Sequence, residues 1–274
     1  MSLELQIIFP GFLACLLLTG FLSYLGLHVL ARGVIFVDIA LAQIAALGTA
    51  FASLNGVEPH TPESYVWSLA FTFVGAALFA LTRGVRKRVP QEAFIGITYV
   101  VAAAAAILVA KFLPHGDEEI KEILIGSLLT VTLPEVGVSA LIFAALAALH
   151  IAFRAKFLSL SFEHESDEGV KPMLWDLLFY ATFGVVVTSS VQMAGVLLVF
   201  SFLIVPAVFS ALFTKSIGVR LPMAWALGAL VSAVGLWGSF KLDLPTGAAV
   251  VVTFGIALVI GAAVRGVLSA RGRA

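Results

Sequence analysis

Charged residues are scarce in this sequence. Asp, Glu, Lys and Arg together make up 12% of its 274 residues, whereas a soluble domain carries about 25%. Hydrophobic residues reach 61%, and they occur in long blocks. This composition excludes an ordinary soluble domain and indicates an integral membrane protein with several spans.

The sequence also lacks several features that other classes of function require. The net charge is zero and Cys15 is the single cysteine, so the sequence offers neither an excess of basic residues for nucleic acid nor an intrachain disulfide. No glycine-rich run precedes the "TKS" at 214–216, so it is not a P-loop, and His164 in "EHESDE" is not part of an HExxH zinc-protease motif. A GxSxG motif is missing too. We therefore predict that the chain is not an enzyme and that any ATP it depends on is bound by a partner subunit.

Long apolar blocks are what the sequence has in abundance. A helix needs about 20 apolar residues to cross a bilayer, and candidate spans lie at 9–31, 34–54, 64–83, 92–113, 134–153, 172–190, 193–213, 220–239 and 245–267. The sixth and seventh have almost no loop between them, so one of the pair could be a partial, re-entrant segment. Residues 118–135 are too short and too charged to span, and predict an amphipathic interfacial helix. We expect an all-α fold, a polytopic membrane helix bundle of about nine spans in which residues 1–274 form one transmembrane domain.

Basic residues predict the orientation. Basic clusters lie at 83–88, 154–156, 215–220 and 265–273. With nine spans they all fall on one side of the membrane, whereas eight spans would split them between both sides. Because Lys and Arg concentrate in cytoplasmic loops, we expect a multi-pass protein of the cell (inner) membrane. Its N-terminus would lie outside the cell and its C-terminus in the cytoplasm.

Asp38 stands inside the second apolar block. A carboxylate at the centre of a span costs roughly 2.5–3.5 kcal/mol on insertion scales, and less near an end. The helical face that it shares holds small residues: Ala42, Ala45, Ala46 and Thr49. Such a face suits close helix contact, so we expect Asp38 to point into the bundle, where it could either line an ion pathway or hydrogen-bond to a neighbouring helix.

Gln43 is the second polar residue of this block. It follows Asp38 by five residues, which places it about 140° away on a regular helix. Only a local wide turn, a π-bulge, would bring the two side chains together. Gln43 could therefore be a pathway residue beside Asp38 or could simply hold helices together.

Four histidines lie near the ends of spans or in the loops between them. His28 and His150 fall late in the first and fifth spans, where hydrogen bonding within the bundle is the more ordinary role. His60 and His115 lie in the predicted outside loops beside several carboxylates. Imidazole with carboxylate suits Zn²⁺ or Mn²⁺, so these two are candidate metal residues, with solvated loop residues as the alternative.

Proline interrupts the seventh block. Pro206 removes a backbone hydrogen bond and kinks or ends a helix, so we expect a broken element whose second piece covers about 207–217. A short helix there could be a docking surface for a soluble partner. The alternative is an ordinary span with a proline kink.

Four segments resemble one family, the permease subunits of metal-uptake ABC transporters for zinc, manganese and iron. "GVLLVFSFLIVPAVFSALFT" at 195–214 is similar to the family's signature around Ile-Ile-Pro-Ala. "LIGSLLTVTLPEV" at 124–136, "LDLPTGAAVVV" at 242–252 and "FPGFLAC" at 9–15 resemble three further family segments. The four occur in the family's order and cover most of the chain.

The resemblance implies a role and partners. Two copies would form a homodimeric pore for a divalent metal, zinc or manganese, with a cytoplasmic ATP-binding subunit and an extracytoplasmic metal-binding protein as partners. No cofactor would be bound covalently. Residues 205–218 would form a cytoplasmic coupling helix, with these docking residues: Pro206, Ala207, Ser210, Phe213, Thr214 and Lys215. The alternative is a stand-alone secondary transporter or channel for a small cation.

The resemblance also aligns the second span with the family's ion-binding positions. Asp38 matches the family's aspartate, but the family's histidine four residues later is absent. Ala42 stands at that position, and Gln43 takes it only if one extra residue is allowed. The ion site is therefore where this sequence departs from the family.

Overall fold

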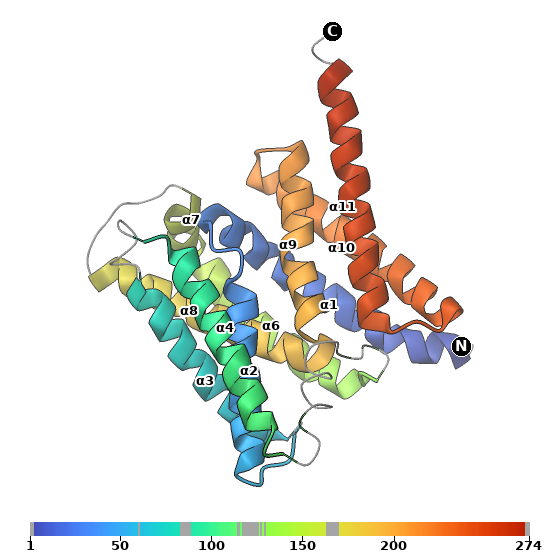
Figure 1. Ribbon diagram of the computed structural model, residues 1–274. Helices are drawn as coiled ribbons and strands as arrows, with labels where there is room; N and C mark the ends of the chain where they lie inside the picture. The colour runs from blue at the N-terminus through green and yellow to red at the C-terminus, as the bar shows by residue number, and fades with distance from the viewer. Residues whose placement is uncertain are drawn as a thin grey trace.

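The molecule is a bundle of helices. The computed structural model describes residues 3–59, 61–82, 89–113, 116, 126, 128, 130–162 and 170–271. Within these ranges the helices are α1 (Leu3–Arg32), α2 (Val37–Leu54), α3 (Pro62–Leu81), α4 (Gln91–Ala110), α6 (Leu133–Ala152), α7 (Arg154–Phe162), α8 (Val170–Ala194), α9 (Val196–Phe213), α10 (Ile217–Leu242) and α11 (Thr246–Arg271). Figure 1 shows their arrangement.

Nine of the described helices are long and apolar enough to cross a membrane. The exception is α7, a nine-residue helix. The predicted all-α bundle of nine spans is therefore confirmed. α8 and α9 are separated only by Gly195, whose φ of 76° ends one helix and starts the next. Both helices have spanning length, so the suggested re-entrant segment is not found in this pair.

Three helices form the centre of the bundle. In the most apolar part of α1, α2 and α8, 67%, 67% and 72% of the residues are buried. The corresponding shares for α4, α6 and α11 are 22%, 17% and 22%, so these helices are peripheral. α2 packs against α3 and α4, while α1 packs against α9 and α10.

α9 continues unbroken through Pro206. The helix ends at Phe213 and α10 begins at Ile217, so the structure has no separate short helix at 205–218. The expectation that Pro206 would end the helix is wrong in this respect. Packing explains the difference: Pro206 and Ala207 are buried, and the backbone of α1 lies directly against Leu203 at Gly26.

Two groups of helix ends lie at opposite sides of the molecule in Figure 1. α7, the turn between α9 and α10, and the C-terminal end of α11 lie toward the top of Figure 1. The turn between α2 and α3 lies at the bottom. The basic cluster 83–88 and the expected interfacial helix at 118–135 fall, wholly or mostly, outside the described residues. Which side faces the cytoplasm remains a prediction.

Candidate functional site

Asp38 lies in the first turn of α2 and is 1% exposed. Its Oδ1 is buried and has no hydrogen-bond partner among the described residues. A helix N-terminus favours a carboxylate by about 0.3–1 kcal/mol, which gives an ordinary reason for an acid in this turn. That does not account for the unpaired oxygen, because a buried acceptor without a partner costs about 1–3 kcal/mol.

The face of α2 that carries Asp38 is buried, as the sequence predicts. Ala42, Ala45 and Ala46 are between 1% and 6% exposed. Gln43 is also buried, at 7%, but α2 is a regular α-helix over its whole length and has no wide turn between 38 and 43. Gln43 therefore points about 140° away from Asp38, and its side chain makes no hydrogen bond with the described part of the chain. The structure does not bring these two residues together.

Glu92 is a second carboxylate at the start of α2, and the sequence reasoning missed it. It belongs to the first turn of α4. Its Oε1 accepts a hydrogen bond from the Phe36 amide at 3.2 Å, just before α2 begins. Its Oε2 is buried and unpaired among the described residues. An acid close behind Pro90 at the head of an apolar block was the signal available in the sequence.

A cavity of about 910 Å³ lies at the other end of α2. Its walls come from the second half of α2, the first half of α3, the start of α6, the end of α8, and Gly126, Thr130 and Val131. Ala45, Ala46 and Thr49 line it from α2, so the small face that begins at Asp38 continues into the cavity.

Paired hydroxyls join α3 to its neighbours beside this cavity. Ser68 Oγ lies 2.6 Å from Thr49 Oγ1 of α2. Tyr65 Oη lies 2.7 Å from Ser189 Oγ, and Thr72 Oγ1 lies 3.0 Å from Thr188 Oγ1, both of α8. Residues 65, 68 and 72 share one face of α3 because they follow the three- and four-residue spacing of a helix. The result is a row of hydroxyl oxygens that runs from the cavity into the bundle.

The described cavity lining contains one carboxylate, that of Glu135, and one of its oxygens is engaged. Glu135 accepts hydrogen bonds from the backbone amide and the hydroxyl of Thr132, at 2.8 and 2.9 Å, and so caps α6. The other polar lining groups are hydroxyls and the amide of Gln192. Among the described residues no three His, Cys, Asp or Glu side chains gather as a metal site. The described lining therefore offers mainly hard oxygen ligands, most of them neutral.

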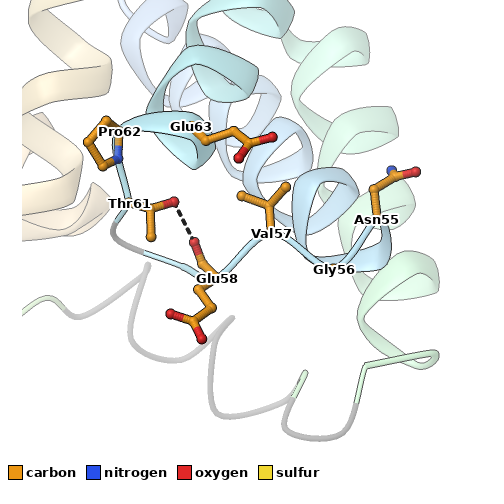
Figure 2. Close-up of a pocket in the computed structure, with 7 residues that line it drawn as sticks. All are labelled: Asn55, Gly56, Val57, Glu58, Thr61, Pro62 and Glu63. Carbon is orange, nitrogen blue, oxygen red and sulfur yellow. Dashed lines mark hydrogen bonds between the residues drawn. The ribbon is translucent and has the colours of Figure 1, made fainter.

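The loop between α2 and α3 encloses a smaller pocket of about 600 Å³ (Figure 2). Glu58 and Glu63 are exposed on its rim, and Thr61 Oγ1 donates a hydrogen bond of 2.8 Å to the Glu58 carbonyl. The candidate metal residues His60 and His115 lie outside the described residues.

His28 and His150 are hydrogen-bonded within the bundle, as predicted. His28 Nδ1 lies 2.9 Å from Ser161 Oγ. His150 Nδ1 lies 3.2 Å from the Tyr24 hydroxyl, and its Nε2 lies 2.9 Å from Thr182 Oγ1. These bonds join α1, α6, α7 and α8 in one buried polar network.

The predicted docking residues separate into buried and accessible ones. Pro206, Ala207 and Ser210 are buried inside the chain, whereas Phe213 and Thr214 are half-buried. Lys215 is exposed in the turn between α9 and α10. Arg220 Nε donates to the Thr214 carbonyl at 2.8 Å and braces this turn.

Comparison with known proteins identifies the family. The family model described as the ABC 3 transport family matches residues 4–265. The chain belongs to the ABC 3 transport family. The resemblance noted in the four sequence segments is thereby confirmed.

Individual relatives agree with this assignment. The chain is 28% identical over 233 residues to the manganese transport system membrane protein MntC of Listeria monocytogenes, covering 81% of each chain. It is 26% identical to the chelated iron transport system membrane protein YfeC of Yersinia pestis, covering 84% of this chain and 76% of that one.

A solved structure shares the fold. PsaBC from Streptococcus pneumoniae in complex with Fab superposes with a TM-score of 0.77 at 19% identity, covering 95% of this chain and 91% of that one. Together with the nine apolar helices, these relatives identify this ABC 3 family member as a multi-pass permease of the cell membrane.

Proposed function

We propose that this ABC 3 family member is the membrane-spanning subunit of an ATP-driven importer of a divalent metal ion. Manganese is the favoured cargo. The observation that carries the proposal is a carboxylate oxygen of Asp38 that is buried in a central helix of a transport permease and has no partner within the described part of the chain. Ionisable residues inside spans are usually functional because their burial is costly.

The chemistry of the route favours manganese over zinc. Carboxylate, hydroxyl and amide oxygens are hard ligands that suit Mn²⁺, while thiolate and imidazole suit Zn²⁺ better. The described cavity lining and the start of α2 supply mainly oxygen ligands, with the Met193 thioether as the exception, and the described part of this lining includes no thiolate or imidazole. The names of the relatives, which refer to manganese and chelated iron, support the same choice.

The route we propose follows α2. A hydrated ion enters the 910 Å³ cavity and exchanges water for the hydroxyls of the α3 row. It then passes Asp38 and Glu92 at the far end of the helix. The two carboxylates carry the charge that compensates the ion where no bulk water is present.

The partners follow from the family. A separate cytoplasmic subunit binds ATP, an extracytoplasmic metal-binding protein delivers the ion, and two copies of this chain form the pore. Docking of the ATP-binding subunit is proposed at the side that holds α7 and the turn around Lys215, the accessible part of the predicted docking segment. A photo-crosslinker at Lys215 should capture that subunit, whereas one at Asn55 in the α2–α3 turn should not.

The role of Asp38 can be tested by replacing its carboxylate with an amide of the same shape. In the complex reconstituted with its ATP-binding subunit, Asp38→Asn should reduce Mn²⁺ uptake on the order of a hundredfold and abolish Mn²⁺-stimulated ATP hydrolysis. The yield of assembled complex should not fall, because the substitution keeps the side-chain shape and removes a buried carboxylate that lacks a partner for Oδ1 among the described residues. Gln43→Leu, the matched control one and a half turns away, should retain uptake within about twofold. Unchanged uptake in Asp38→Asn would remove Asp38 from the mechanism.

A further inference from the structure

The side chain of Arg32, the last residue of α1, is almost fully buried. Its Nη1 lies 2.8 Å from Asp176 Oδ1 of α8, with side-chain exposures of 2% and 0%. Its Nε donates to Ser161 Oγ of α7 at 2.8 Å, and its guanidinium lies 3.9 Å from the centre of the Phe179 ring. One side chain therefore fixes the end of α1 to both α7 and α8.

Stability alone is a weak reason for such a pair. Burying two charges costs several kcal/mol for each ion before their attraction repays it, and apolar replacements of similar volume are often as stable. The planar guanidinium, which donates to Ser161 through Nε and to Asp176 through Nη1, does, however, define direction as well as distance, which an apolar contact does not. The pair is therefore better suited to fixing a position than to adding stability.

What the pair can position is the start of α2. Only four residues, Gly33 to Phe36, separate Arg32 from that helix. The connection is tight: Gly33 has a φ of 66°, the Val34 amide bonds to the Val29 carbonyl at 3.2 Å, and the Val37 amide bonds to the Val34 carbonyl at 3.2 Å. A displacement of Arg32 is thus transmitted to Asp38 through a short hydrogen-bonded turn.

The end of this turn next to α2 is also fixed by a hydrogen bond. Glu92 of α4 accepts from the Phe36 amide. The first residues of α2 therefore lie between an anchor on α8, through Arg32 and Asp176, and an anchor on α4, through Glu92. These anchors come from helices far apart in the sequence, so a relative movement of α8 and α4 changes where Asp38 lies.

We propose that the Arg32–Asp176 pair is a positioning device that sets Asp38 for cation binding. The pair does not touch the ion. It holds the end of α1 on α8, and a change in that contact moves the carboxylate that the ion meets. This inference rests on the proposed function, because it takes Asp38 as a residue of the metal route.

The experiment compares two changes on α8 in the complete complex with its ATP-binding subunit. Asp176→Asn removes the charge that holds Arg32 and keeps the side-chain shape. Thr182→Val is the matched control: it removes the buried bond to His150 in the same network but leaves Arg32 and the α1–α2 turn untouched. The readout is ATP hydrolysis as a function of Mn²⁺ concentration, together with hydrolysis in the absence of metal.

We expect the KM for Mn²⁺ to change while the rate of ATP hydrolysis without metal does not. Asp176→Asn should raise the KM for Mn²⁺ on the order of tenfold, while metal-free hydrolysis stays near the wild-type level. Thr182→Val should leave this KM within about twofold. A merely structural role would lower all activities together and leave the KM unchanged, and that outcome would overturn the proposal.

A second variant of the pair is needed in case the complex with Asp176→Asn assembles poorly. Arg32→Lys keeps the cation but cannot bond to Ser161 and Asp176 in the same geometry, so an intermediate KM is expected. If both pair variants fail to assemble while Thr182→Val assembles, the pair is structural and the proposal is wrong. If the wild-type complex shows no response to Mn²⁺, the proposed function itself fails, which is a distinct result.

Discussion

At the scale of single residues, two carboxylates at the start of α2 are unusual. Asp38 and Glu92 each keep a buried oxygen without a partner among the described residues. Glu92 has a structural task too, since its other oxygen accepts from the Phe36 amide. Its charge and its hydrogen bond can be separated by substitution, because a glutamine retains the acceptor and an alanine removes both.

Glu92→Gln should therefore leave folding intact and reduce Mn²⁺ uptake roughly fivefold or more. Glu92→Ala should additionally lower the free energy of unfolding by about 0.5–1.5 kcal/mol, the usual value of one hydrogen bond. Uptake by reconstituted complexes and thermal unfolding in detergent measure the two effects. Equal uptake by Glu92→Gln and wild type would show that Glu92 only caps α2.

The sequence reveals some of these residues and not others. The burial of Asp38 and of its alanine face follows from helical periodicity, because residues three and four apart share a face. Glu92, the Arg32–Asp176 pair and the α3 hydroxyl row depend on contacts between helices far apart in the chain. Periodicity carries no information about which helices become neighbours, so these features emerge only in three dimensions.

At the scale of helices, close backbone contact fixes the central packing. Without a side chain, Gly26 of α1 lets the Leu203 carbonyl of α9 lie where a methyl group would overlap it. Gly20, six residues earlier on the same helix, has open space where a Cβ would lie. Small residues at helix crossings allow this kind of approach in membrane bundles.

Gly26→Ala should therefore destabilise the protein by about 1–3 kcal/mol, the usual cost of overpacking. Gly20→Ala should be neutral or slightly stabilising, since alanine favours the helix more than glycine does. Thermal unfolding of the two variants in detergent gives the comparison. Equal stability would mean that α1 and α9 can separate at this crossing without cost.

The same crossing explains why proline was misleading as a signal. A proline inside a helix removes one backbone hydrogen bond and favours a break. In α9 the surrounding packing keeps the helix continuous, because Pro206 and Ala207 are buried between other helices. Tertiary contact overrides local preference here, and the sequence alone could not indicate which would prevail.

At the scale of the whole molecule, the nine spans were predictable and their arrangement was not. Blocks of about 20 apolar residues identify spans from composition alone. The division into central helices α1, α2 and α8 and peripheral helices α4, α6 and α11 appears only in the structure. The peripheral helices carry large exposed apolar side chains such as Leu108, Leu141 and Val259, which suits contact with lipid or with a second copy.

We expect this permease to move a divalent metal only when an ATP-binding subunit drives it. This expectation is tested most directly by Mn²⁺ uptake into vesicles that contain the chain with or without that subunit, in the presence and absence of ATP and of a proton gradient. Uptake is expected only with both the subunit and ATP. Uptake by the chain alone, driven by a proton gradient, would contradict this expectation and indicate a secondary transporter.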